Sequence, residues 1–182
     1  LDPHAAATYR SAHFETQLFE EDANAFLRRI KESGSDLPGP GDVDLLAGGP
    51  PCQGFSGYNR HRSSDDPRNS LLETFLGFVD FLKPPHVLIE NVPGMLSIEN
   101  GSVVYALLET LKHFGYSTRL GVLQAGHYGL PQNRWRVFVW AALAQDALPT
   151  FPFPTHEFPR TTLFGATKFR DAVVKAPKVA ES

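Results

Sequence analysis

The one cysteine of this sequence, Cys52, is the residue best suited to nucleophilic chemistry. It lies in a loop rich in glycine and proline (GGPPCQGFS), directly after a short apolar run. A lone cysteine is more often a small buried core residue, and that interpretation stays open here. A rigid loop at the carboxyl end of a strand can instead hold a thiol in a cleft, where nearby cations favour the nucleophilic thiolate. The pattern therefore makes Cys52 a candidate nucleophile.

Glu90 is the second candidate, because it ends the apolar Val-Leu-Ile run of a predicted buried strand. A carboxylate in that position is costly unless it is paired or used in chemistry. A salt bridge to Arg134 or Arg136 is the structural interpretation of this residue. A protonated or hydrogen-bonding Glu90 opposite a nucleophilic Cys52 is the catalytic interpretation.

Basic residues cluster in two parts of the chain, although its net charge is −3. A polar loop predicted over residues 57–69 contains Arg60, Arg62 and Arg68. Further along, polar residues alternate into a predicted strand, which should place Gln132, Arg134 and Arg136 on one face, as the wall of a cleft would require. Such clusters can contact phosphate, but a solvated loop and an exposed edge strand are equally open interpretations.

The elements that would position these residues alternate between strand and helix. Hydrophobic period and capping predict helices over residues 19–30, 71–82 and 103–114, and strands over residues 43–47, 86–90, 120–123 and 137–142. This order is typical of an α/β fold with a mostly parallel sheet, whose last two strands are antiparallel because no helix joins them. Ligands of such sheets bind beyond the carboxyl ends of the strands. If the first two strands are parallel neighbours, Cys52 and Glu90 lie at the same edge.

Length and composition fit one globular domain of 182 residues, of which 42% are hydrophobic and 20% charged. They exclude a disordered tail and a disulfide-stabilised miniprotein, since one cysteine cannot form an internal disulfide. The spacing of histidine, cysteine and carboxylate residues predicts no metal site, and no apolar run approaches the roughly 20 residues that span a membrane. The chain begins with Leu1 rather than methionine, which is typical of a piece of a longer protein.

Three motifs together resemble those of the DNA (cytosine-5)-methyltransferases. They are the Pro-Cys-Gln loop around Cys52, the Glu-Asn-Val tripeptide that begins at Glu90, and the Gln-x-Arg-x-Arg pattern that begins at Gln132. Each motif alone is weak or moderate, whereas all three in this order and spacing are highly specific. The Glu-Asp-Ala-Asn turn around Asp22 and the residues 121–126 before the arginine motif are similar to the eukaryotic maintenance-type branch.

The resemblance implies a Rossmann-like, S-adenosylmethionine-dependent methyltransferase fold that is incomplete at both ends. Residues 1–148 would form the central part of the catalytic domain, and the proline- and phenylalanine-rich residues 149–182 would lead into a target-recognition domain. The resemblance also implies methylation of carbon 5 of cytosine, double-stranded DNA with a flipped-out cytosine as the partner, and a location in the nucleus.

The same resemblance implies roles for individual residues. Cys52 would attack carbon 6 of cytosine while Glu90 hydrogen-bonds or protonates ring nitrogen 3. Arg134 would support Glu90 and the flipped base, and Arg136 would support the phosphate or the loop nearby. The cofactor, S-adenosylmethionine, would contact Asp22, Ala23, Gly49, Pro50 and Leu71. The DNA would contact Gln53, Ser56, Arg60, Arg62, Arg68 and Gln132.

Two other functions remain open. The transfer-RNA cytosine-5 branch has the same three motifs, although the long insertion at residues 31–41 and the run Val-Leu-Gln-Ala-Gly favour the DNA branch. A non-catalytic DNA-binding scaffold would keep the fold without its chemistry, and the intact Cys52, Glu90 and Arg134 argue against it. A 5-fluorocytosine substrate separates an enzyme from a scaffold, because only an enzyme is trapped on it as a covalent adduct.

Overall fold

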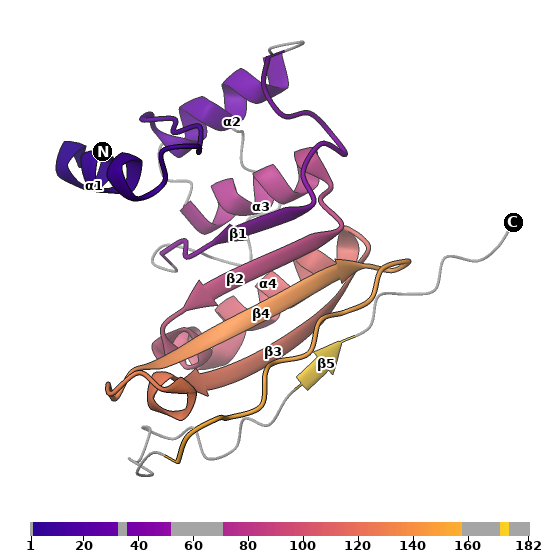
Figure 1. Cartoon of the computed structure of the whole chain (residues 1–182). Helices are drawn as coiled ribbons and strands as arrows, with labels where there is room; N and C mark the ends of the chain where they lie inside the picture. The colour runs from indigo at the N-terminus through magenta and orange to yellow at the C-terminus, as the bar shows by residue number, and fades with distance from the viewer. Residues whose placement is uncertain (1, 33–35, 52–70, 158–171, 175–182) are drawn as a thin grey trace, which may run out of the picture.

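The chain folds around a five-stranded sheet with helices packed against one face (Figure 1). The computed structural model describes residues 2–32, 36–51, 71–157 and 172–174. Within these residues, strands and helices alternate along the chain from β1 to β3. The predicted α/β fold is therefore confirmed.

The strands are β1 (Leu45–Gly48), β2 (His86–Asn91), β3 (Tyr116–Gln124), β4 (Trp135–Leu143) and β5 (Ala172–Val174), in the spatial order β1-β2-β4-β3-β5. β1 and β2 pair in parallel. This was the condition for the prediction that Cys52 and Glu90 lie at the same edge of the sheet. β3 and β4 pair antiparallel, again as predicted. β5, which the sequence did not predict, pairs antiparallel with β3.

The pairing of the strands is less parallel than the sequence predicted. β1, β2 and β3 run in the same direction, but β4 lies between β2 and β3 and pairs antiparallel with both. Among the described strands, only the β1–β2 pair is parallel. The cause is the connection between β3 and β4 over residues 125–134, since a parallel crossover needs about a dozen residues or more. The short connection instead folds β4 back beside β3.

The described residues form four α-helices: α1 (Pro3–Ala12), α2 (Ala23–Glu32), α3 (Leu71–Leu82) and α4 (Ser102–His113). α3 has the predicted bounds, and those of α4 differ from them by one residue. α2 begins later than predicted because Asp22 caps it, its carboxylate accepting hydrogen bonds from the amides of Asn24 and Ala25. α1 was not predicted; it begins in the same way, with Asp2 as its cap.

Short 3₁₀ turns complete the connections between these elements. η1 (Pro93–Leu96) and η2 (Ile98–Gly101) lead from β2 to α4, and η3 (Ala125–Tyr128) leads from β3 towards β4. None of the helices in the described ranges is long and apolar enough to cross a membrane.

The hydrophobic core lies between the sheet and helices α3 and α4. Val87 and Ile89 of β2 face this core, so the alternate residue Glu90 projects from the other face of the sheet. The two helices contribute buried residues at helical spacing, namely Leu72, Leu76, Val79, Val103, Leu107 and Leu111. Glu90 therefore stands on the face that α3 and α4 leave uncovered.

Residues 149–157 follow β4 without regular structure and run beside β3 and η3 (Figure 1). The ring of Phe151 lies against Gly121 of β3, where an added Cβ would come within 2.4 Å of the ring. The hydroxyl of Tyr128 donates a hydrogen bond to the carbonyl of Pro152 at 3.1 Å. This segment is thus packed against the sheet, while its role as a lead into a recognition domain stays a prediction.

Candidate active site

The carboxyl ends of β1 and β2 bring the entrance of the cysteine loop next to Glu90. The parallel register pairs Gly48 with Ile89, so Gly49 follows beside Glu90. A Cβ added to Gly49 would lie 3.0 Å from Oε2 of Glu90, so this glycine lets the carboxylate approach the loop closely. Cys52 comes three residues after Gly49 and lies outside the described residues.

Asn91, the last residue of β2, ties the loop to the sheet. Its side-chain amide donates a hydrogen bond to the carbonyl of Pro50 at 2.8 Å, and its Oδ1 accepts one from the amide of Val92 at 2.9 Å. Asn91 is only 7% exposed, and its bond to Pro50 is buried. Asn91 was not among the predicted site residues. Its place in the Glu-Asn-Val motif is the sequence feature that could have identified it.

Glu90 has two arginines nearby at unequal distances. Nε of Arg136 lies 2.7 Å from Oε1 of Glu90, whereas Nη2 of Arg134 lies 4.0 Å from the same oxygen. The side chain of Arg136 is 22% exposed and that of Arg134 is 46% exposed. The resemblance had assigned the support of Glu90 to Arg134, but the shorter and better shielded contact comes from Arg136. A charge-assisted hydrogen bond at this distance fixes the orientation of the carboxylate.

The register of β4 explains which arginine approaches Glu90. Glu90 pairs with Phe138, and Arg136 is two residues from Phe138, so it projects from the same face of the sheet. Arg134 precedes the strand, which begins at Trp135. Its backbone amide donates to the carbonyl of Gln132 at 2.9 Å in a tight turn.

The prediction that residues 132–136 alternate along one strand is wrong for Gln132, although Arg134 and Arg136 both approach Glu90. Gln132 is exposed, and its amide donates to the carbonyl of Leu130 at 2.6 Å, so it belongs to the turn before β4. Local hydrogen bonds of this turn replace the strand pairing that the polar alternation indicated. Gln132 thus does not share a strand face with Arg136.

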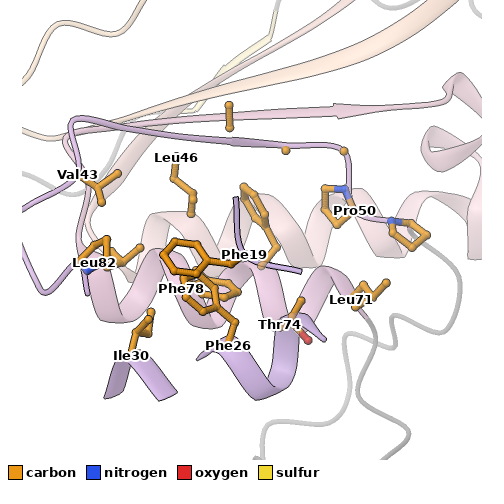
Figure 2. Close-up of a pocket in the computed structure, with 17 residues that line it drawn as sticks. Phe19, Phe26, Ile30, Val43, Leu46, Pro50, Leu71, Thr74, Phe78 and Leu82 are labelled. Carbon is orange, nitrogen blue, oxygen red and sulfur yellow. The ribbon is translucent and has the colours of Figure 1, made fainter. Parts of the chain in front are cut away.

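A pocket of about 500 Å³ lies between β1 and helices α2 and α3 (Figure 2). Four of the five residues predicted to contact the cofactor line it, namely Ala23, Gly49, Pro50 and Leu71. The fifth, Asp22, is exposed and caps α2 at the mouth of the same region. The pocket extends along β1 to Gly49 and Pro50, which also contact Glu90 and Asn91.

Aromatic rings form much of the wall of this pocket. Phe19 and Phe26 have stacked rings with centroids 4.7 Å apart, and Phe78 of α3 follows 5.8 Å from Phe26 (Figure 2). Thr74 adds a buried hydroxyl, which donates to Oδ1 of Asn24 at 2.6 Å. The sequence alone does not distinguish these rings from core residues, because aromatic residues at helical spacing are more often core than binding site.

The remaining predicted site residues lie outside the described residues. They are Gln53, Ser56, Arg60, Arg62 and Arg68, in addition to Cys52. In the parts of the chain that the structure describes, no three His, Cys, Asp or Glu side chains are grouped so that they could hold a metal ion.

The chain is similar in sequence to several DNA (cytosine-5)-methyltransferases. In sequence, the chain is 45% identical over 158 residues to the DNA (cytosine-5)-methyltransferase CMT2 of Arabidopsis thaliana, covering 82% of this chain and 12% of that protein. It is 41% identical over 165 residues to the DNA (cytosine-5)-methyltransferase 1 of Mus musculus, covering 86% of this chain and 10% of that protein. The chain thus spans about a tenth of the length of these relatives.

Solved structures agree with these sequence matches. A putative DNA modification methyltransferase encoded within a prophage of E. coli superposes with a TM-score of 0.58 and 30% identity, over 78% of this chain and 38% of that one. A DNMT2 variant of Spodoptera frugiperda has the same fold, with a TM-score of 0.58 and 24% identity over 89% of this chain and 45% of its own.

The family model described as C-5 cytosine-specific DNA methylase matches residues 1–178, nearly the whole sequence. The motifs around Cys52, Glu90 and Gln132 carried the resemblance in the sequence, and the Rossmann-like methyltransferase fold of the solved relatives agrees with it. The chain belongs to the C-5 cytosine-specific DNA methylase family.

Proposed function

We propose that the protein transfers a methyl group from S-adenosylmethionine to carbon 5 of cytosine in DNA. The observation that carries the proposal is that the same two residues border both parts of the site. Gly49 and Pro50 line the aromatic pocket, and they also contact Glu90 and Asn91. A methyl donor in the pocket and a base held by Glu90 would therefore meet at Gly49 and Pro50. Cys52 follows Pro50 by two residues.

Activation of the base supports this assignment of residues. Carbon 5 of cytosine is a poor nucleophile until a nucleophile has added at carbon 6. The Cys52 thiolate forms that bond, while Glu90 hydrogen-bonds or protonates ring nitrogen 3 and takes up the charge that develops there. Once carbon 5 has formed its bond to the methyl group, a base would remove the proton from carbon 5, and Cys52 would leave as thiolate while the ring double bond re-forms. Arg136, 2.7 Å from Glu90, orients the carboxylate towards the ring.

The pocket suits the proposed cofactor in shape and chemistry. When bound, S-adenosylmethionine supplies an electrophilic methyl group. Phe19, Phe26 and Phe78 offer an apolar aromatic wall against which a planar base can pack. Ala23 and Leu71 line the same pocket, and Asp22 stands beside it at the start of α2. These residues would hold the adenine end and direct the methyl end towards Gly49.

The partner that we propose is double-stranded DNA with a flipped-out cytosine. Carbon 6 is unreachable inside a stacked duplex, so an enzyme of this chemistry extrudes the base. The arginines at positions 60, 62 and 68, together with Gln53, Ser56 and Gln132, are the proposed contacts to DNA. A nuclear location follows from a chromosomal substrate, and the relatives from Arabidopsis and mouse are eukaryotic proteins.

Covalent trapping tests the proposed function. The full-length protein that carries this chain is incubated with S-adenosylmethionine and duplex DNA containing 5-fluorocytosine, in which fluorine blocks the final elimination. We expect a denaturation-resistant adduct from the wild type and none from Cys52→Ser, which is nearly isosteric and keeps cofactor binding. An adduct with Cys52→Ser would show that another residue attacks. Trapping only by transfer RNA carrying 5-fluorocytosine would reassign the substrate, and a wild type that is never trapped would contradict the proposal.

A further inference from the structure

Arg29, on α2, holds together the aromatic wall of the pocket from outside. Its guanidinium carbon lies 5.4 Å from the ring centroid of Phe19 and 5.2 Å from that of Phe26. Both rings line the pocket, whereas Arg29 is not one of its lining residues. One cation is thus placed over two stacked rings, and cation–π attraction acts on both of them.

The same guanidinium fixes the turn that precedes α2. Nε of Arg29 donates to Oε2 of Glu21 at 3.3 Å, and Nη2 donates to Oε1, which makes the pair bidentate. Glu21 is followed by Asp22, whose carboxylate caps α2. The turn from Phe19 to Asp22 is therefore held at one side by Arg29 and at the other by the helix cap.

We infer that Arg29 is a positioning residue for the end of the pocket that takes the planar base of the methyl donor. The inference rests on the proposed function. The flat guanidinium can stack on two rings while its fork bonds a carboxylate, a combination that a lysine ammonium does not provide. Without it, Phe19 and Phe26 are free to adopt other rotamers, and the bound base loses a preorganised wall.

A purely structural role is the alternative, because a half-exposed ion pair on a helix surface can stabilise α2 without any effect on a ligand. The two roles differ in what they change. A positioning role weakens every ligand that contains the base and spares the rate at saturating cofactor. A stabilising role changes the unfolding midpoint and leaves ligand affinity unchanged.

Ligand binding to the full-length protein separates these roles. The probes are S-adenosylhomocysteine and 5′-methylthioadenosine, which keeps the adenosine but lacks the amino-acid end. We expect Arg29→Gln to weaken both by about three- to tenfold, equivalent to about 0.7–1.4 kcal/mol. Arg29→Lys should fall between Arg29→Gln and the wild type. The matched control is Arg28→Gln, the exposed neighbour on α2, which should bind both probes as the wild type does.

Kinetics adds a second readout. Arg29→Gln should raise the KM for S-adenosylmethionine by the same factor, with kcat and the KM for DNA unchanged. Glu21→Gln, which leaves the guanidinium over the rings, should weaken both probes in the same direction but less, and it replaces Arg29→Gln if that variant does not fold. The inference would be overturned if Arg28→Gln and Arg29→Gln bound the probes with equal affinity. It would also be overturned if Arg29→Gln weakened the binding of S-adenosylhomocysteine alone. A wild type that binds neither probe would contradict the proposed function itself.

Discussion

Glu90, which we propose contacts ring nitrogen 3 of the cytosine, has two arginines nearby that are not equivalent. Arg136 is fixed in β4, and its Nη1 also donates to the carbonyl of Trp135 at 2.7 Å. Arg134 lies in the preceding turn and reaches Glu90 only at 4.0 Å. A short charge-assisted bond from an anchored donor orients a carboxylate more firmly than a longer contact from an exposed side chain.

Replacing each arginine by glutamine tests this difference at the residue scale. Arg136→Gln should lower kcat by about 10- to 100-fold, because a hydrogen bond to a charged group contributes about 1.5–3 kcal/mol. Arg134→Gln should lower it by no more than about fivefold, since a half-exposed pair contributes at most about 1 kcal/mol. Steady-state methyl transfer to DNA gives both values, and each variant is the control for the other. A larger loss with Arg134→Gln would return the supporting role to that residue.

At the scale of elements, a side chain at the start of β3 is hydrogen-bonded to the connection between α3 and β2. Tyr116 is fully buried there, and its hydroxyl donates to the carbonyl of Pro84 at 2.7 Å. Burial, with a smaller contribution from Asp80, raises the pKa of Tyr116 from 10.0 to about 12. This phenol therefore joins β3 to the α3–β2 connection only while it keeps its proton.

The raised pKa gives a pH dependence of stability with a definite sign. The unfolded chain ionises Tyr116 near pH 10 and the folded protein only near pH 12, so the stabilisation is complete below pH 10 and is lost as pH rises towards 12. Tyr116→Phe should cost about 1 kcal/mol in the free energy of unfolding below pH 10, and less as pH approaches 12. Urea unfolding of both proteins across this range measures the difference. A gap that widens with pH would contradict the assignment.

At the scale of the whole molecule, the chain covers only part of the length of its relatives. It spans 38% of the solved prophage methyltransferase and about a tenth of the curated relatives. β1 lies at one edge of the described sheet, and the pocket lies beside that strand. The sequence contains no Gly-x-Gly-x-x-Gly, the pattern that binds a nucleotide cofactor in many folds of this class.

The isolated chain should therefore transfer methyl groups at least about 100-fold more slowly than the full-length protein. Cofactor hydrogen bonds supplied by other segments contribute about 1–3 kcal/mol each, and two of them at about 1.4 kcal/mol each account for this factor. Transfer from labelled S-adenosylmethionine to DNA by equal amounts of the two proteins measures the ratio. Comparable rates would show that these residues already make a complete catalytic unit.

The sequence by itself determined the features that depend on local order. The hydrophobic period and the caps predicted α3, β2 and α4 closely, because apolar residues at period 3.6 or 2 reveal a buried face wherever the partner lies. The motifs around Cys52, Glu90 and Gln132 predicted the family, because their residue types, order and spacing resemble those of the family. The helix between β1 and β2 favoured a parallel arrangement, whereas their direct adjacency was only a condition of the prediction until the strand pairing showed it.

Only the tertiary structure decided how distant segments meet. The hairpin of β3 and β4 places β4 next to β2, and that register brings Arg136, rather than Arg134, to within 2.7 Å of Glu90. The bond from Asn91 to Pro50 likewise joins residues that are 41 positions apart in the sequence. Such contacts depend on strand pairing and side-chain packing across the fold, which no local pattern of residues specifies.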